Sequence, residues 1–407
     1  AMTLLVAPAV FGTLVAVPTY FIGKRLGGRL GGLFGVLVLA LIPGQFLYRG
    51  LVGFADHNVV EPFFQTFAVL AMMVAVSVAE RERPVYELVV DRDFAALRRP
   101  VGVSALAGVA TALYLWTWPP GILLVGIFGV FFTLKLSADY VRGVSPDHLA
   151  FVATTSMSVT SLLLLVPFGT VSFSPTKFSL LQPLLPFAVA VGAAFMAWLA
   201  RTWDDRDLSP TLYPVAILAI LALVALVVRF ALPDLFNLIR SNLVRFVGFS
   251  AGAQSRTIGE AKPFLQDGSL ASAVIPEYGL MFFTAIVGAA VMVWRSFAAD
   301  EHEAEKLLVL VWAAFITAAA FTQVRFNYYL AVPVAVLNAY LLGWILGFVG
   351  FPDTAGSAVR DVEAYQVLAV FFVVLLIVPG LVMPVSVGGS QTYTATDMGK
   401  SATPSAA

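Results

Sequence analysis

The sequence predicts an all-α membrane protein, a polytopic transmembrane bundle of about twelve helices. Hydrophobic residues make up 60% of the chain and charged residues only 12%. The mean hydropathy of +0.91 lies far above that of soluble domains. Apolar windows recur along almost the whole sequence. A transmembrane β-barrel is excluded, because its strands would be about ten residues of alternating polarity.

The expected spans are windows of roughly 17 to 23 mostly apolar residues, the length that crosses the hydrocarbon core as a helix. They cover residues 3–23, 31–48, 61–79, 102–118, 120–137, 148–168, 183–200, 211–232, 272–294, 307–322, 327–349 and 365–386. The absence of cysteine excludes disulfides and thiolate metal sites, and a formal net charge of +0 gives no indication of a nucleic-acid partner.

Lysine and arginine gather in alternate loops, which predicts the orientation because positively charged loops stay on the cytoplasmic side. Basic clusters within 24–29 and 81–99 therefore put the loops 49–60 and 233–271 on the outer side. Two explanations are open for cations on that side: snorkelling to the lipid head groups, or an anionic ligand held at the outer surface. The cations concerned are Arg49, Arg240, Arg245, Arg256, Lys262 and Arg325.

A polar segment at 49–58 lies between two spans and brings Arg49, Asp56 and His57 to one membrane edge. Ionisable groups at such an edge are costly, so a functional interpretation comes first. Asp56 and Asn58 carry oxygen donors of the kind that hard divalent cations take, although Asn58 is uncharged. His57 is interpreted as a neighbouring interfacial residue, and Glu61 with the proline after it as the start of the next helix.

The outer loop 233–271 carries a carboxylate, Glu260, between the cations Arg256 and Lys262. Such a residue is either a solvated surface group or a second metal ligand that completes a site with Asp56. The sequence leaves both interpretations open.

A third outer feature is the segment 323–329, at the junction of two spans. Arg325 offers a rigid fork of donors that can grip phosphate oxygens. Tyr328 and Tyr329 are interpreted as part of an interfacial aromatic belt, although Tyr328 is also a neighbour of the candidate site.

Three motifs give the chain a resemblance to a known family. Arg49 precedes the Asp56-His57-Asn58 triplet by seven residues, a Thr-Ile-Gly-Glu motif ends at Glu260, and Arg325 is followed by phenylalanine. In this order and at these loop positions they resemble the motifs of the archaeal oligosaccharyltransferases of the AglB type. In that family an asparagine is unusual at the position of Asn58.

The resemblance implies the GT-C type of glycosyltransferase membrane domain over residues 1–386. Residues 387–407 would begin the linker to an extracellular C-terminal domain that reads the acceptor sequon. The family's first helix and its catalytic aspartate have no counterpart here, so we expect the isolated chain to be inactive.

The resemblance also implies a reaction at the outer face of the cell membrane. An oligosaccharide would pass from a dolichyl phosphate or diphosphate carrier in the lipid to the asparagine of an Asn-x-Ser/Thr sequon in an acceptor protein. Asp56, Asn58 and Glu260 would hold Mn²⁺ or Mg²⁺, and Glu260 would help to activate the acceptor amide. Arg325 would bind the lipid-linked phosphate and Arg49 would brace the metal ligands. The remaining candidate site residues, with less defined roles, are His57, Arg256, Lys262 and Tyr328.

Two other classes of function are compatible with a multi-helix membrane protein. Another polyprenyl-dependent glycosyltransferase would have its main carboxylate in the first outer loop and would lack the motif that ends at Glu260. A secondary transporter would show repeat symmetry and charged or broken segments near the bilayer midplane. The charges of this chain gather instead at the outer edge.

Overall fold

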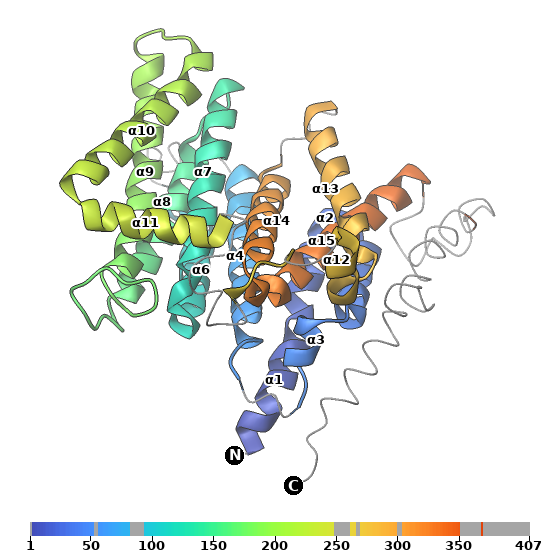
Figure 1. Ribbon diagram of the computed structural model, residues 1–407. Helices are drawn as coiled ribbons and strands as arrows, with labels where there is room; N and C mark the ends of the chain where they lie inside the picture. The colour runs from blue at the N-terminus through green and yellow to red at the C-terminus, as the bar shows by residue number, and fades with distance from the viewer. Residues whose placement is uncertain are drawn as a thin grey trace. The chain divides into compact units, whose positions relative to one another are not determined.

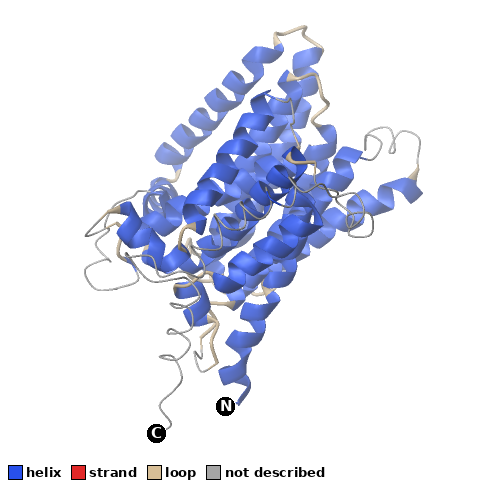
Figure 2. Cartoon of the chain, turned by 90° about the vertical axis from the view of Figure 1, so that its right-hand side faces the viewer, coloured by secondary structure: helices blue, strands red, loops and turns tan. Residues whose placement is uncertain are grey.

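The computed structural model describes residues 2–52, 56–81, 93–247, 261–265, 269–298 and 303–350, together with Leu368. Nearly all of these residues are helical (Figures 1 and 2). A single isolated bridge, between Thr170 and Ser179, is the extent of β-pairing in this part of the chain. The all-α prediction is therefore confirmed.

The α-helices differ widely in length, from one turn to seven. They are α1 (Met2–Leu14), α2 (Ala16–Leu41), α3 (Gln45–Arg49), α4 (Val60–Arg81), α6 (Phe94–Thr117), α7 (Leu123–Val141), α8 (Asp147–Leu164), α9 (Leu181–Asp204), α10 (Tyr213–Ala231), α11 (Pro233–Val247), α12 (Leu270–Tyr278), α13 (Met281–Ala298), α14 (Ala304–Thr322) and α15 (Asn327–Phe348). Short 3₁₀ turns connect some of them: η1 (Pro119–Ile122), η2 (Pro210–Leu212) and η5 (Val324–Phe326).

Nine helical stretches of the described ranges are long and apolar enough to cross a membrane. The predicted number of about twelve membrane spans is therefore not confirmed within the described residues. The first two predicted spans merge into one stretch, Leu5–Leu41. The helix predicted at 148–168 exists as α8, but its serines and threonines lower its hydropathy. The span predicted at 272–294 breaks at Gly279, where φ is 61°, and 365–386 lies outside the described residues except for Leu368.

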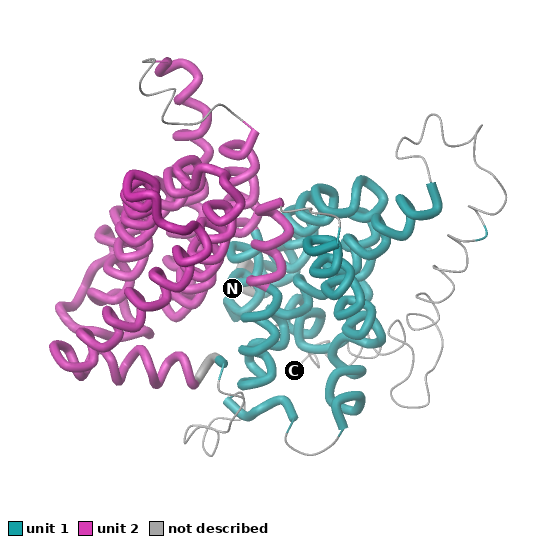
Figure 3. The backbone as a smooth tube through the Cα atoms, turned by 90° about the horizontal axis from the view of Figure 1, so that it is seen from above, with its two compact units in different colours: residues 1–66, 245–302, 313–407 teal, residues 67–244, 303–312 magenta. Residues whose placement is uncertain are grey.

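The chain forms two compact units, drawn in different colours in Figure 3. Unit 1 comprises residues 1–66, 245–302 and 313–407. Its centre is α15, which packs on α2 and α13 and is buried over most of its length. A Cβ atom on Gly343 of α15 would lie 2.2 Å from the carbonyl oxygen of Gly27 in α2. Small residues thus allow the two backbones to touch, as is typical of helix pairs in membranes.

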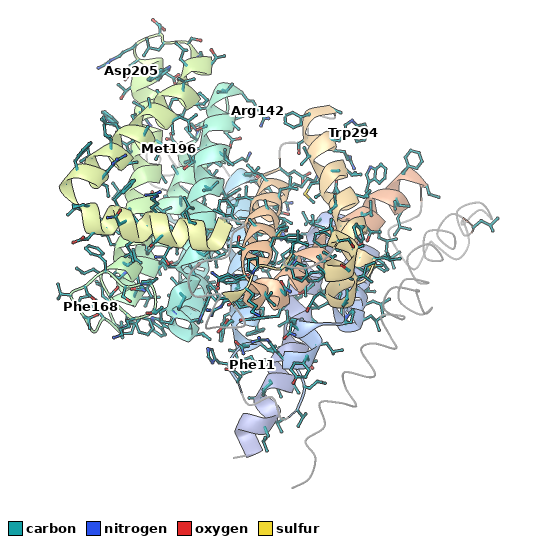
Figure 4. The ribbon with its side chains drawn as sticks, in the orientation of Figure 1. Phe11, Arg142, Phe168, Met196, Asp205 and Trp294 are labelled. Carbon is teal, nitrogen blue, oxygen red and sulfur yellow. The ribbon has the colours of Figure 1, made fainter. Side chains whose placement is uncertain are left out.

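Unit 2 comprises residues 67–244 and 303–312, with α8 packed on α6 and α9, and α7 packed on α9. Within it the Tyr213 hydroxyl, at the start of α10, donates a 2.7 Å hydrogen bond to the carbonyl of buried Met196 in α9. Asp205 marks the end of α9 from which the chain turns into α10 (Figure 4). Most other residues of α10 are apolar and exposed, as expected for a helix that faces lipid.

Candidate active site

The Asp56 loop, residues 56–58, precedes α4 in unit 1 and is held by its own hydrogen bonds. The Asp56 carboxylate accepts from the backbone N–H of His57 at 2.7 Å and from the side-chain amide of Asn58. The Nδ1 atom of His57 lies 2.8 Å from Asp56 Oδ1. Because the Asp56 side chain is 42% exposed, its carboxylate stays open to a ligand from outside the loop.

Glu61 fixes this loop to α15. Its side chain is 1% exposed, and its Oε2 atom accepts hydrogen bonds from the hydroxyls of Tyr328 at 2.7 Å and Tyr329 at 2.5 Å. Its Oε1 atom lies 3.1 Å from Nε2 of His57. The imidazole of His57 therefore bridges the carboxylates of Asp56 and Glu61. The hydrogen bond to Glu61, opposed by desolvation and supported by both negative charges, raises the pKa of His57.

These contacts correct two of the sequence interpretations. Tyr328 and Tyr329 are buried, so the aromatic-belt interpretation is wrong for both. Their hydroxyls donate hydrogen bonds to the buried carboxylate of Glu61, inside unit 1. Glu61 does lie in the first turn of α4, as predicted, but it also contacts the candidate site through His57.

Arg49, the last residue of α3, is buried. Its Nε atom donates to Gln45 Oε1 at 3.3 Å, and its guanidinium lies 4.8 Å from the ring centroid of Tyr328. The same tyrosine hydroxyl is 3.4 Å from Asn58 Oδ1. Arg49 thus reaches the candidate ligands through Tyr328, which is compatible with the bracing role expected for it.

The start of α3 is held by Glu277 of α12, a residue that the sequence analysis did not single out. Its Oε2 atom accepts the backbone N–H of Gln45 at 2.9 Å. Burial raises the pKa of Glu277, against the effect of that N–H and of Arg49, which favour the charged form. Gly44 has a φ of 90° and approaches Glu277 so closely that a Cβ would lie 2.4 Å from the carboxylate.

Within the loop 233–271, the described segment 261–265 lies against the turn that carries Arg325. The backbone N–H of Val324 donates to the carbonyl of Lys262 at 2.9 Å, and that of Phe264 donates to Phe321 at 3.2 Å. Arg325 lies in η5, directly before α15, with its guanidinium 5.5 Å from the ring of Phe326. The side chain of Lys262 is exposed. Glu260 and Arg256 lie outside the described residues, so their predicted positions stay predictions.

The donors of the Asp56 loop suit a hard divalent cation in chemistry but do not complete a site by themselves. Asp56 offers an exposed carboxylate and Asn58 an amide oxygen, both ligand types that Mg²⁺ and Mn²⁺ take. No three His, Asp or Glu side chains among the described residues form a group that could hold a metal ion. A metal site at this loop would need a further ligand, and Glu260 stays the predicted one.

Tyr329, Gln45, Glu277 and the contact of Glu61 with His57 were not predicted as parts of this arrangement. Two of them had a local signal at the spacing at which helical side chains meet: Glu61 follows His57 by four residues, and Gln45 precedes Arg49 by four. Gln45 and Glu277 are 232 residues apart in the chain.

Comparison with known proteins identifies the family. The model of the family "Oligosaccharyl transferase STT3, N-terminal" matches residues 2–385. The chain belongs to the STT3 oligosaccharyl transferase family. It is 48% identical, over an alignment 463 residues long, to the dolichyl-monophosphooligosaccharide–protein glycotransferase AglB of Haloferax volcanii. The alignment covers 97% of this chain and 44% of that protein. It is 26% identical over 347 residues to the dolichyl-phosphooligosaccharide-protein glycotransferase 3 of Archaeoglobus fulgidus. That alignment covers 82% of this chain and 38% of the relative.

Solved STT3-family structures share the fold. The oligosaccharyltransferase AglB of Archaeoglobus fulgidus, in complex with an inhibitory peptide and a dolichol-phosphate, matches 98% of the chain with a TM-score of 0.82 at 23% identity. The chain covers 45% of that protein, so it spans less than half the length of the relatives that it matches. Another structure of the Archaeoglobus fulgidus oligosaccharyltransferase is a complex with Zn and sulfate, with a TM-score of 0.70 and 21% identity over 98% of this chain and 41% of that one.

Proposed function

We propose that this chain is the membrane domain of an oligosaccharyltransferase that moves an oligosaccharide from a dolichyl phosphate or diphosphate carrier to the asparagine of Asn-x-Ser/Thr sequons. Membership of the STT3 family supports this reaction. The observation that carries it is local: His57 and Glu61 link the open Asp56 loop to Tyr328 and Tyr329, three and four residues after Arg325. A metal-ligand loop and a phosphate-binding arginine thus belong to one compact unit.

In this proposal each residue has an electrostatic or a positioning role. Asp56, Asn58 and Glu260 hold a divalent cation, Mn²⁺ or Mg²⁺, which offsets negative charge at the leaving phosphate when it is bound. Arg325 grips the lipid-linked phosphate with its guanidinium fork. Arg49 and Glu61 position the loop through Tyr328 and His57. Glu260 accepts a hydrogen bond from the acceptor amide, whose delocalised lone pair makes it a poor nucleophile.

The test is transfer of glycan from a lipid-linked oligosaccharide to a sequon peptide, by the complete protein in detergent. We expect activity to need Mn²⁺ or Mg²⁺ and to be lost with a chelator. Asp56→Ala and Glu260→Ala should each lower the rate by about 10²-fold or more, because each removes a ligand of the cation and Glu260→Ala also removes the contact with the acceptor amide. Asp205→Ala is the matched control, since Asp205 is an exposed carboxylate at the end of α9.

Arg325→Gln separates donor binding from metal binding. We expect it to raise the KM for the lipid-linked donor and to leave the apparent affinity for Mn²⁺ unchanged. Full activity of both Asp56→Ala and Glu260→Ala would refute the site. Absence of transfer by the intact protein with any lipid-linked donor, while it still bound Mn²⁺, would refute the reaction and leave the metal site in place.

A further inference from the structure

We propose that the junction of α10 and α11 is a second anion site, which binds the phosphate of an anionic membrane-lipid head group. The site is a cavity of about 500 Å³ lined by Arg229, Pro233, Phe236, Asn237 and Arg240. All five residues belong to unit 2, and none belongs to the site described above. The proposal therefore does not depend on the proposed function.

Arg229, in the last turn of α10, is held by aromatic rings. Its guanidinium lies 6.0 Å from the ring centroid of Phe230 and 5.9 Å from that of Phe236. Aromatic faces attract the cation by its charge and leave its N–H donors free for oxygen atoms. Among the described residues no carboxylate forms an ion pair with Arg229 or Arg240.

The other lining residues share one face of α11. Pro233, Phe236, Asn237 and Arg240 follow the spacing i, i+3, i+4 and i+7, which brings side chains to the same side of a helix. Asp234, the nearest acid in sequence, lies on a different face and does not line the cavity. Two arginines and an asparagine from two helices therefore line one space, together with Pro233 and Phe236. This combination suits a phosphate joined to an apolar body.

The place of the cavity favours a lipid as the source of that phosphate. The candidate span Pro210–Ala231 ends beside it, and residues along that span are apolar and exposed, including Leu221, Leu223 and Val227. The next helix, α11, leaves at a steep angle to the axis of α10 (Figure 1). The cavity thus lies where a lipid-facing helix leaves the hydrocarbon, at the level of the head groups. Snorkelling alone would require neither a cavity nor two cations that line it.

The test measures lipid retained by the purified full chain in native mass spectrometry. The probes are phosphatidylglycerol, a phosphate-free galactolipid and inorganic phosphate at equal concentration. The variant Arg229→Gln/Arg240→Gln is compared with Arg206→Gln, which removes an exposed arginine before the opposite end of α10. We expect the wild-type chain and Arg206→Gln to retain phosphatidylglycerol in preference to the galactolipid. The double variant should bind phosphatidylglycerol about tenfold more weakly, since two charge-assisted contacts are lost.

Equal retention of phosphatidylglycerol by the double variant and the wild-type chain would overturn the proposal. Displacement of phosphatidylglycerol by inorganic phosphate would overturn the lipid as the source. The thermal midpoints of the variants provide the check on folding. If the double variant does not fold, the single variants Arg229→Gln and Arg240→Gln replace it, and each should weaken retention several-fold.

Discussion

At the scale of the residue, the environment of Glu61 decides where the Asp56 loop lies. A carboxylate that is almost fully buried needs donors, because its desolvation is otherwise uncompensated. Glu61 has two tyrosine hydroxyls and one imidazole nitrogen within reach. The imidazole also contacts Asp56. A residue with no assigned role in metal binding thus holds the exposed candidate ligand in place.

Removal of either tyrosine hydroxyl tests this arrangement. Tyr328→Phe and Tyr329→Phe should each lower the free energy of unfolding by about 1.5–3 kcal/mol, the usual worth of a hydrogen bond to a charged group. Thermal melting in detergent measures the loss. Tyr20→Phe is the control, because the Tyr20 hydroxyl has no hydrogen-bond partner within the described ranges. If all three variants melted alike, Glu61 would not depend on these donors.

Glu277 gives a pH dependence with a definite sign. Burial raises its pKa above the ordinary value of 4.5, so the folded state prefers the protonated carboxyl. At a pH below 4.5 the carboxyl of Glu277 is protonated in both the folded and the unfolded state, so the folded protein loses no stability there. As the pH rises, the unfolded chain ionises first and stability falls, until the pH passes the raised pKa of the folded state.

The variant Glu277→Gln cannot ionise, so it should lack this loss. We expect the thermal midpoint of the variant to rise relative to that of the wild-type chain as the pH increases from about 4 to about 7. Melting curves at several pH values measure the difference. A difference that stays constant over this range would show that Glu277 titrates normally.

At the scale of the element, α2 and α15 approach more closely than ordinary side chains allow. Gly27 and Gly28 have non-helical backbone angles, and φ of Gly28 is 73°. The resulting kink brings the carbonyl of Gly27 against Gly343 of α15. Backbone contact of this kind stabilises a pair of helices in lipid by packing, since the hydrophobic effect does not drive their association there.

Two glycines one turn apart on α15 provide a matched test. Gly343→Ala should destabilise unit 1 by about 1–3 kcal/mol, because the new Cβ would overlap the backbone of Gly27. Gly347→Ala should be neutral or stabilising by about 0.5–1 kcal/mol, because nothing lies within 4 Å of its Cβ position and alanine favours the helix. Thermal melting of the two variants measures the contrast, and equal midpoints would contradict the close contact.

Over the whole molecule, both compact units expose apolar side chains, and a buried cation of unit 2 lies beside two carboxylates. Trp294 and Leu223 are both 59% exposed, in different units. Buried Lys135 of α7 lies 2.7 Å from Asp139 and 3.1 Å from Glu80. This distribution is that of a protein whose solvent is lipid, where unpaired charge is costly and exposed apolar surface is not.

The predicted orientation can be tested on the intact membrane because the chain contains no cysteine. We expect Val52→Cys and Lys177→Cys to react with a membrane-impermeant maleimide added from outside. Asp205→Cys should react only after the membrane is opened, because its loop carries the positive charges Arg201 and Arg206. All three positions are exposed and therefore suited to labelling. If only Asp205→Cys were labelled in sealed cells, the orientation of the chain would be the opposite of the predicted one.

Composition and apolar windows were enough to predict the helical membrane fold, because a bilayer accepts few structures and helices need long apolar runs. The ends of the helices could not be predicted as well from the sequence. The break at Gly279 and the joined stretch Leu5–Leu41 depend on backbone angles and packing that hydropathy does not record. The spacing of Arg49 and Asp56 indicated a polar site, but the role of Tyr329 had no local signal.

Residue type and spacing along the chain were sufficient for the multi-span membrane fold and for a prediction of which short motifs form the site. The contacts of Glu61 with His57, Tyr328 and Tyr329 appear only in the tertiary structure. The tertiary structure also brought Gln45 to Glu277 and Lys262 to Val324. The physical reason is that buried polar groups must find partners, and those partners come from segments far apart in the chain.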